Sequence, residues 1–443
     1  MSGRLFGTDG IRGKALQWPL DKPTVVRLGA ALAEELQAAG CEPRILLAGD
    51  TRASTETLAG WLASSFTGSG GTVTWGGVLP TPAVSRLLAD STCAAGVVIS
   101  ASHNPAEDNG IKVLGPGGEK IDDPLERRLE AALGTVTPQR GPGLPELSPE
   151  LAEDYLAMLT STHPTEQPLK GLHVVLDCAN GAASEIGPAL LEHLGARVTA
   201  MASSPDGANI NLRCGATAPE ALIERVRSVG ADAGLALDGD ADRAVLVDEG
   251  GRLLDGDDIL LVWARHLKDE DRLPGHGVVA TVMSNFGLER ALCADGMSVT
   301  RCAVGDRSVW LAMKDNGIAL GGEQSGHIIC SHLSVSGDGL LTGSHILAIA
   351  ASKQCRLSEL SDLQRMPQLL LNIPIAEKRP FEELSGVTAE LDEVNARLEG
   401  RGRVLLRYSG TEPLARVMVE GEDDAEIDAL ANRLADAIRH DLG

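Results

Sequence analysis

The stretch Arg44-Ile-Leu-Leu-Ala-Gly-Asp50 is a short apolar run that ends in Gly and Asp, as a buried strand does at its turn. Before it, Leu28, Leu32, Glu35 and Leu36 follow a helical period. After it, helical and strand-like segments alternate, at residues 57–65, 72–76, 83–88 and 95–100. This alternation predicts an α/β fold, in which helices cover a sheet.

The same alternation returns further along the chain and then changes. We predict domains at 1–163, 164–255 and 256–368, each mixed α/β, and a smaller α+β domain at 369–443. In the last of these the order is strand, helix, strand, strand, helix, and the final helix has Ile427, Leu430, Leu434 and Ile438 on one face. The pair Gly-Asp recurs at Gly49-Asp50, Gly239-Asp240 and Gly305-Asp306. This recurrence, which we call the Gly-Asp echo, fits three related α/β units but could also arise by chance.

Charge and composition exclude several classes of function. The 443 residues include 39 Lys and Arg against 62 Asp and Glu, a net charge of −23, which argues against a general nucleic-acid binder and against docking on anionic lipid. No apolar run approaches the length of a membrane span, and the first residues do not resemble a signal peptide. The eight cysteines form no CxxC pair, so we expect a reducing, cytoplasmic location.

The segment Ser100-Ala-Ser-His-Asn-Pro105 follows an apolar run, and Asp108-Asn-Gly-Ile-Lys112 comes soon after it. Asn-Pro and Asn-Gly form turns, so a plain hairpin is one interpretation. Against it, Ser102, His103 and Lys112 lie within eleven residues. We expect a serine at such a strand end to be exposed. No G-x-S-x-G motif surrounds it, which argues against an acyl-transfer nucleophile.

The segment Asp238-Gly-Asp-Ala-Asp-Arg243 places three carboxylates at alternate positions after another apolar run. Hard divalent cations such as Mg²⁺ prefer oxygen ligands of this kind. A calcium loop would need Gly where Arg243 stands. A solvated acidic turn is the remaining alternative, although three carboxylates without a partner would repel one another. The segment therefore favours a Mg²⁺ site.

Two further polar segments are rich in glycine or turn residues. In Gly321-Gly-Glu-Gln-Ser-Gly-His327 we expect polar groups that point outward, with Glu and Ser suited to sugar hydroxyls and His to proton transfer. A structural histidine beside a strand is the alternative. In Arg407-Tyr-Ser-Gly-Thr-Glu-Pro413 the Arg, Ser and Thr side chains suit a phosphate group. An ordinary glycine turn between two strands would also explain this segment.

Taken in this order, the four segments resemble the signature loops of the α-D-phosphohexomutase superfamily, and within it the bacterial phosphoglucosamine mutases. The resemblance extends from Phe6-Gly-Thr-Asp-Gly-Ile-Arg-Gly13 to Val417-Met-Val-Glu-Gly421. It includes residues 177–182, 283–285 and 304–307. The chain departs from the pattern at Ser308, Trp310 and Arg213, outside the motif cores. The resemblance implies three similar α/β domains and a smaller fourth around one central cleft.

The resemblance also implies a role for each matching residue. Ser102 would be the phosphoserine, and Asp238, Asp240 and Asp242 would hold one Mg²⁺ together with an oxygen on Ser102. The reacting end would be lined by Arg12, His103, Lys112, Arg243 and His327. Sugar hydroxyls would bind Glu323 and Ser325. The phosphate that does not react would bind Arg407, Ser409, Gly410 and Thr411, with Arg416 nearby.

The implied reaction interconverts glucosamine 6-phosphate and glucosamine 1-phosphate through a sugar 1,6-bisphosphate, on the route to UDP-N-acetylglucosamine and the cell wall. A phosphomannomutase or phosphoglucomutase with the same residues is the alternative. A Mg²⁺-dependent phosphatase and a non-catalytic sugar-phosphate sensor fit less well. The sequence does not determine the oligomeric state, for which a homodimer is the candidate. We expect the fourth domain to move when substrate binds.

Overall fold

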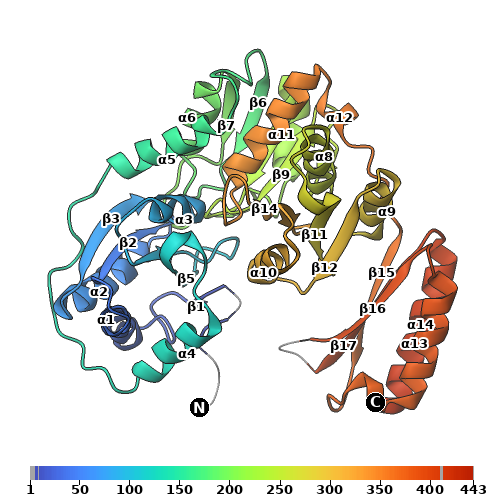
Figure 1. Ribbon diagram of the computed structural model, residues 1–443, viewed down its shortest axis with the longest axis horizontal. Coiled ribbons are helices and arrows are strands. Elements are labelled where there is room, and N and C mark those ends of the chain that lie inside the picture. The colour runs from blue at the N-terminus through green and yellow to red at the C-terminus, as the bar shows by residue number, and fades with distance from the viewer. Residues whose placement is uncertain (1–4, 8, 410–412, 443) are drawn as a thin grey trace. The chain divides into compact units, whose positions relative to one another are not determined.

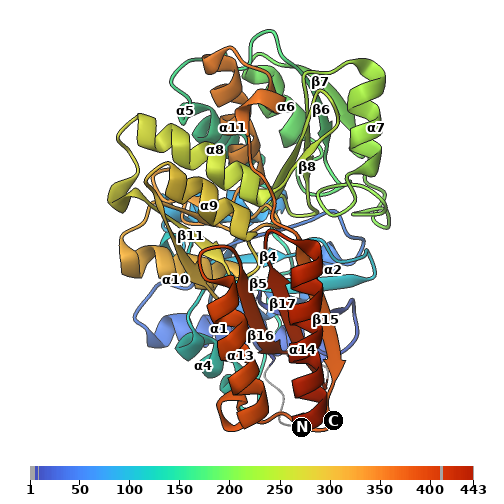
Figure 2. The same cartoon turned by 90° about the vertical axis from the view of Figure 1, so that its right-hand side faces the viewer.

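The computed structural model describes residues 5–7, 9–409 and 413–442. The chain forms two compact units, one of residues 1–281 and 300–361, the other of residues 282–299 and 362–443. The first unit contains most of the mixed α/β structure, and the second contains a small antiparallel sheet with two long helices (Figures 1 and 2).

The first sheet has five strands, and its central strands are fully buried. The predicted strand around Arg44–Gly49 is β2, and the five residues of β4 are all buried. Asp21 caps the first helix by accepting a hydrogen bond from the Thr24 amide, with proline in the first turn. The strand order is β1-β5-β4-β2-β3. The elements are β1 (Ile11–Lys14), α1 (Lys22–Ala38), β2 (Arg44–Gly49), α2 (Thr55–Gly68), β3 (Thr72–Val78), α3 (Thr81–Ala89), β4 (Ala95–Ile99), β5 (Asp108–Leu114), a 3₁₀ turn at Pro116–Gly118 and α4 (Asp123–Ala132).

The second sheet repeats this arrangement with the order β10-β9-β8-β6-β7. Every residue of β6, β8 and β9 is buried, as expected for strands covered on both faces. Its elements are α5 (Glu150–Ser161), β6 (His173–Asp177), α6 (Ile186–His193), β7 (Arg197–Met201), α7 (Glu220–Val229), β8 (Ala233–Leu237), β9 (Ala244–Asp248) and β10 (Leu253–Leu254).

The third sheet has the order β12-β11-β13-β14. The first helix of this part of the chain is α8, and Asp255 and Asp258 form a capping box at its N-terminus. The elements are α8 (Gly256–Asp269), a 3₁₀ turn at Pro274–His276, β11 (Gly277–Thr281), α9 (Phe286–Ala294), β12 (Ser298–Cys302), α10 (Asp306–Asn316), β13 (Leu320–Gly322), β14 (Ile328–Cys330), α11 (Gly339–Lys353) and α12 (Leu357–Leu360).

The three sheets share one topology, which confirms the prediction of three similar α/β domains. In each sheet a first strand pairs in parallel with a third, in β2–β4, β6–β8 and β11–β13. The third strand then pairs antiparallel with a fourth, in β4–β5, β8–β9 and β13–β14. The Gly-Asp echo does not follow this repeat, because its three copies come after β2, in the β8–β9 hairpin and after β12.

From residue 362 onward, the second unit confirms the predicted order of strand, helix, strand, strand and helix. Its sheet is antiparallel with the order β15-β17-β16. On the last helix the predicted apolar face is buried, at Ile427, Leu430, Leu434 and Ile438. The elements are β15 (Gln368–Pro374), a 3₁₀ turn at Phe381–Glu383, α13 (Ser385–Leu398), β16 (Arg403–Tyr408), β17 (Leu414–Glu420) and α14 (Asp424–Leu442).

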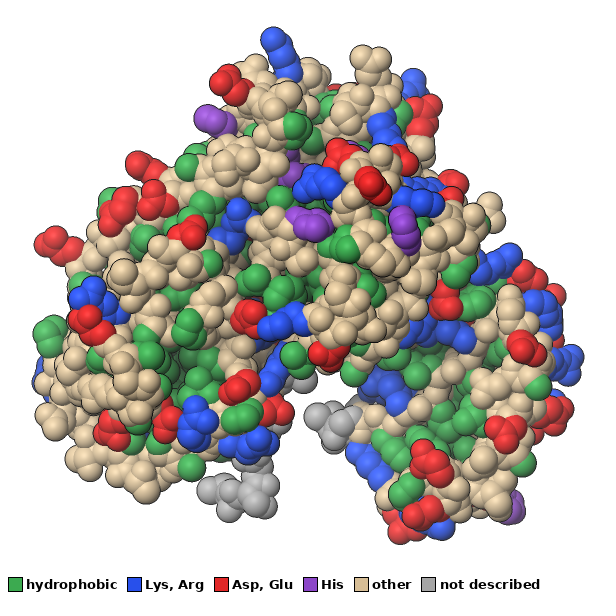
Figure 3. All heavy atoms as spheres, viewed as in Figure 1, with side chains coloured by type: hydrophobic (Ala, Val, Ile, Leu, Met, Phe, Trp, Pro, Cys, Tyr) green, Lys and Arg blue, Asp and Glu red, His purple; other side chains and the backbone are tan. Residues whose placement is uncertain are grey.

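Two surface properties bear on the classes excluded above. Among the described residues, we find no helix with both the length and the apolar character of a membrane span. On the face drawn in Figure 3, acidic and basic side chains are interspersed. The net charge of −23 is therefore not gathered into one continuous patch on that face.

Candidate active site

Ser102 lies in the loop that joins β4 to β5, and it is fully buried. Its Oγ donates a hydrogen bond of 2.5 Å to Asp238 Oδ2 and lies 3.2 Å from His103 Nδ1. The backbone has a φ of +51°, a left-handed conformation that costs a residue with a side chain about 1 kcal/mol. The expectation that this serine is exposed is therefore wrong. The hairpin interpretation is confirmed, since β4 and β5 pair antiparallel, and the connection between them holds the Ser102 hydroxyl beside Asp238.

The carboxylates of Asp238, Asp240 and Asp242 lie in the equivalent loop between β8 and β9, all buried. One oxygen from each lies within 4.8 Å of the others. Burial and the two neighbouring carboxylates raise the pKa of Asp238 well above its usual range. Oδ1 of Asp240 and Oδ1 of Asp242 are buried without a hydrogen-bond partner. Unsatisfied, converging carboxylate oxygens suit a hard divalent cation, so these residues fit the predicted Mg²⁺.

Lys112 brings one positive charge to this cluster. Its Nζ lies 2.7 Å from Asp240 Oδ2, 3.3 Å from Asp242 Oδ2 and 3.1 Å from Asp9 Oδ2. Burial alone would lower the pKa of Lys112, but the three carboxylates raise it well above its usual range. The same ammonium helps to lower the pKa of Asp242 against the effect of burial. Lys112 therefore stays charged, and it offsets only part of the negative charge.

Three more of the predicted residues surround the same serine and carboxylates. Burial, together with the charges of Arg243 and Arg12, lowers the pKa of His103 to about 4. His103 is therefore neutral near pH 7 and able to accept a proton. Arg243 Nε lies 3.8 Å from Asp242 Oδ1, and Arg12 pairs with Asp9. Both guanidinium groups are partly exposed, so they can also meet an anionic ligand.

The third equivalent loop, between β13 and β14, contains Glu323, Ser325 and His327. Ser325 is exposed, whereas Glu323 and His327 are buried, so the expectation of outward-pointing polar groups holds for the serine alone. Glu323 accepts a hydrogen bond of 3.0 Å from the Gly305 amide. His327 Nε2 lies 3.9 Å from Asp306 Oδ2, and its Nδ1 is buried without a partner.

In the second unit, Arg407 and Arg416 lie opposite each other on β16 and β17. Like charges at paired positions repel, and a bound anion would relieve that repulsion. Ser409 is buried, and its carbonyl accepts a hydrogen bond of 2.5 Å from Lys378 Nζ, a cation that the sequence did not single out. The predicted residues Gly410 and Thr411 lie outside the described part of the chain.

Sequence reasoning missed two groups of residues in the first unit. Asp50 and Arg52 follow β2 and contact the Ser102 loop, although the sequence marked Asp50 only as part of an echo. The sequence did contain a signal for this pair, because an apolar strand followed closely by an acidic and a basic residue indicates charges that are buried as a pair. Lys120 pairs with Asp9 and Asp306, and no sequence pattern pointed to this lysine.

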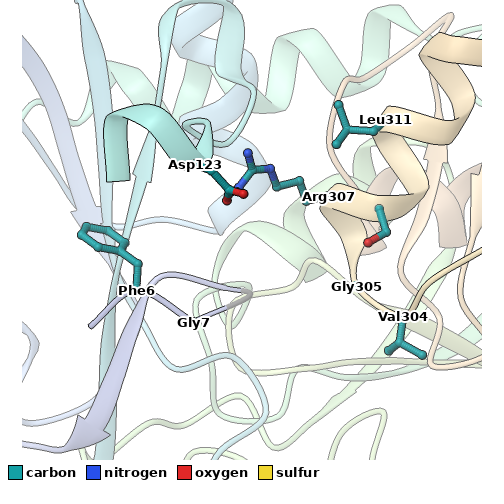
Figure 4. A pocket seen from close by; sticks show the side chains of 8 residues that line it. Phe6, Gly7, Asp123, Val304, Gly305, Arg307 and Leu311 are labelled. Atoms are coloured by element: carbon teal, nitrogen blue, oxygen red, sulfur yellow. The ribbon is translucent and has the colours of Figure 1, made fainter. Parts of the chain in front are cut away.

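Two cavities adjoin these residues within the first unit. One, of about 450 Å³, is lined by Phe6, Gly7, Asp123, Val304, Gly305, Arg307, Ser308 and Leu311. In it Arg307 points toward Asp123, at 2.7 Å (Figure 4). The other, of about 230 Å³, has Asp242, His327 and Lys120 among its lining residues. It therefore provides room for a polar ligand directly beside the carboxylate cluster.

Comparison with known proteins places this geometry in a family. The chain matches the phosphoglucomutase/phosphomannomutase α/β/α domains I, II and III over residues 3–140, 153–251 and 255–366, and the C-terminal domain over residues 370–437. A protein of Cereibacter sphaeroides described as phosphoglucosamine mutase is 45% identical over 445 residues, 99% of each chain. Another of that description, from Solibacter usitatus, is 43% identical over the full length of both chains.

A solved structure agrees in fold. A phosphoglucomutase/phosphomannomutase family protein from Burkholderia thailandensis superimposes with a TM-score of 0.82 at 23% identity, covering 99% of this chain and 98% of the other. At 23% identity this likeness shows the fold alone. The relatives at 43–45% identity are similar in sequence over the whole chain. The chain therefore belongs to the phosphoglucomutase/phosphomannomutase family of mutases, among its phosphoglucosamine mutases.

Proposed function

We propose that this enzyme interconverts glucosamine 6-phosphate and glucosamine 1-phosphate, with Ser102 as the residue that gives and takes the phosphoryl group. The observation that carries the proposal is the 2.5 Å hydrogen bond between Ser102 Oγ and Asp238, within a buried cluster of three carboxylates. The relatives at 43–45% identity over the whole chain support the choice of an amino sugar.

In the proposed reaction, phosphoserine 102 transfers its phosphoryl group to the free hydroxyl of the sugar monophosphate, which yields a 1,6-bisphosphate. The Ser102 oxygen leaves, and the hydroxyl proton passes to a neighbouring base. The phosphoryl group at the other end of the sugar is then transferred to the Ser102 oxygen. The sugar oxygen that leaves takes the proton back from the base, and the isomeric monophosphate is released. A small amount of sugar 1,6-bisphosphate would phosphorylate Ser102 at the start.

The carboxylates of Asp238, Asp240 and Asp242 would hold Mg²⁺, which when bound supplies positive charge against the phosphoryl oxygens. Lys112, Arg243 and Arg12 add fixed positive charge around the same point. Phosphoryl transfer depends chiefly on the position of the reacting groups and on positive charge near the phosphoryl oxygens. These residues would supply that charge.

Proton transfer needs a neutral acceptor close to Ser102. His103 fits this role best, since its ring lies 3.2 Å from Ser102 Oγ and its pKa of about 4 leaves it unprotonated at pH 7. His327 is a second candidate. Lys112, with its raised pKa, would instead stay charged and bind a phosphoryl oxygen.

Sugar recognition would fall to Glu323 and Ser325. The phosphate that does not react would bind Arg407, Ser409 and Arg416, together with Gly410 and Thr411 from outside the described residues. A phosphomannomutase or phosphoglucomutase specificity with the same catalytic residues is the second candidate, favoured only by the broader family description.

A Ser102→Ala variant tests the chemistry. We expect it to bind glucosamine 6-phosphate with an affinity close to that of the wild type and to lose turnover. Intact-mass spectrometry should find one phosphoryl group on the wild type after incubation with a sugar 1,6-bisphosphate, and none on the variant. Turnover by the variant would overturn the role of Ser102, and an unmodified, inactive wild type would indicate a sensor instead.

A further inference from the structure

The buried pair Asp50 and Arg52 holds the Ser102 loop from the neighbouring strand. Arg52 follows β2, which lies beside β4 in the first sheet, and its side chain has no exposed area. Arg52 contacts the loop through its backbone carbonyls, and Asp50 contacts it through Ser100. Among the described residues, neither member of the pair hydrogen-bonds Ser102 Oγ, whose partners are Asp238 and His103. Any effect of this pair on the reaction must therefore pass through the position of the loop.

The guanidinium of Arg52 has five N–H donors, and all five have an acceptor. Nε donates to Asp50 Oδ2 at 2.9 Å. Nη2 donates to the carbonyls of Ser102 at 3.0 Å and Asn104 at 2.8 Å. Nη1 donates to the carbonyls of Asp108 at 3.0 Å and of Pro105. One side chain thus fixes four carbonyls of the turn that presents the nucleophile.

Asp50 extends the same support to the other peptide group of Ser102. Asp50 Oδ2 accepts a hydrogen bond of 2.6 Å from Ser100 Oγ, and Ser100 Oγ accepts one of 3.0 Å from the Ser102 amide. Both the amide and the carbonyl of Ser102 are therefore bound, directly or through Ser100, to the Asp50–Arg52 pair. Asn211 adds a second donor to the Ser102 carbonyl, at 2.9 Å.

This support answers a conformational need at Ser102. The left-handed φ of +51° is unfavourable for serine, and such a residue persists only when its surroundings fix it. Displacement of the reactive oxygen by 1 Å can cost about 100-fold in rate. We propose that Arg52, paired with Asp50, is a positioning residue that sets the geometry of phosphoryl transfer at Ser102. This proposal rests on the mutase chemistry proposed above.

The test compares three variants of the full chain. Arg52→Lys keeps a positive charge beside Asp50 but loses the planar guanidinium that binds four carbonyls. Ser100→Ala removes only the Ser100 hydroxyl that links Asp50 to the Ser102 amide. Arg86→Lys is the matched control, because Arg86 also holds backbone carbonyls, those of Leu333 at 2.6 Å and Met158 at 3.5 Å. Rapid-quench mass spectrometry would measure the rate of Ser102 phosphorylation by glucose 1,6-bisphosphate. Calorimetry would measure the affinity for glucosamine 6-phosphate.

We expect Arg52→Lys to slow phosphorylation about 30-fold or more and Ser100→Ala to slow it about fivefold, with affinity within about threefold of the wild type. Arg86→Lys should lower the melting temperature without slowing transfer beyond about twofold. Equal rates for Arg52→Lys and Arg86→Lys, or a loss confined to affinity, would overturn the proposal. If Arg52→Lys does not fold, an unchanged rate in Ser100→Ala would overturn it.

The same experiment separates this inference from the proposed function. A wild type that accepts the phosphoryl group but does not convert glucosamine phosphates would refute the choice of sugar, and the comparison of rates would still decide the role of Arg52. A wild type that never becomes phosphorylated would overturn both.

Discussion

At the scale of single residues, the carboxylate cluster buries three acidic side chains close to one another, which raises the pKa of Asp238. Among the described residues, Lys112 is the one ammonium that contacts both Asp240 and Asp242, and Oδ1 of each of these aspartates has no hydrogen-bond partner. Burial of several like charges is costly unless opposite charge compensates them. The cluster is therefore organised for a ligand of positive charge.

We predict that Asp242→Asn weakens Mg²⁺ binding more than about 10-fold, because it removes one of three converging carboxylates. Isothermal titration of the metal-free protein with Mg²⁺ would measure the change. Asp248→Asn is the control, since Asp248 is equally buried but accepts hydrogen bonds from Gly250 and Arg252 in a turn. Equal affinity in the wild type and Asp242→Asn would contradict the assignment.

Residue types and spacing predicted this cluster. Three carboxylates within five positions repel one another unless a cation binds them, so the pattern indicates a cation site. The burial of Ser102 could not be predicted, since it depends on contact with Asp238, 136 residues further along the chain. Arg52 was missed for a similar reason. Its acceptors are backbone carbonyls, which leave no trace in the sequence.

At the scale of elements, the three signature loops of the first unit occupy the same place in three repeated hairpins. The chain thus places Ser102, the three aspartates and the loop of Glu323 at equivalent positions by repeating one connection, β4–β5, β8–β9 and β13–β14. Alternation of helix and strand predicted the repeated units. The Gly-Asp echo did not locate the repeat, because two residues carry too little information to align three units.

A pair of glycine substitutions tests how His327 is held. A Cβ at Gly337 would lie 2.4 Å from the His327 ring, so Gly337→Ala should displace the imidazole, destabilise the fold by about 1–3 kcal/mol and lower kcat. Gly60, inside α2, has open space at its Cβ, so Gly60→Ala should stabilise the fold by about 0.5–1 kcal/mol and leave kcat unchanged. Chemical denaturation and steady-state kinetics would measure both, and full activity in Gly337→Ala would argue against a role for His327.

A stack of two buried rings, His163 and Trp263, with the half-buried His345 between them should make stability depend on pH. The ring centroids of His163 and His345 lie 4.3 Å apart, and His345 stacks on Trp263. Burial lowers the pKa of His163 to about 4, and burial with the nearby His163 lowers that of His345 to about 3. In the unfolded chain these histidines bind protons near pH 6.5, well above their pKa values in the fold. The contribution of the stack to the free energy of unfolding is therefore fully present above about pH 6.5 and is lost as the pH falls toward 4.

The variant His345→Phe removes one of these groups. Its melting temperature should therefore fall less between pH 7.5 and pH 5, the range in which the unfolded chain begins to bind the extra protons. The same substitution at His193, exposed on α6, is the control and should leave the slope unchanged. Parallel pH profiles for the wild type and His345→Phe would show that the stack does not contribute.

At the scale of the whole molecule, the four-part family match agrees with three repeated α/β sheets and a small C-terminal sheet. Repetition of one hydrophobic pattern made this architecture predictable from the sequence. The domain limits at 163, 255 and 368, the cytoplasmic location and the homodimer stay predictions, as does movement of the fourth domain. Solution scattering with and without a sugar bisphosphate would test that movement.

Sugar specificity separates the glucosamine phosphate reaction from its alternative, and steady-state kinetics measures it. Purified enzyme with Mg²⁺ and a trace of sugar 1,6-bisphosphate would be assayed on glucosamine 6-phosphate, glucose 1-phosphate and mannose 1-phosphate. We predict a kcat/KM for the amino sugar at least about 100-fold above the other two, which corresponds to about 2.7 kcal/mol of transition-state discrimination. Equal or faster turnover of glucose or mannose phosphates would contradict the proposal and move the enzyme to the phosphoglucomutase or phosphomannomutase alternative.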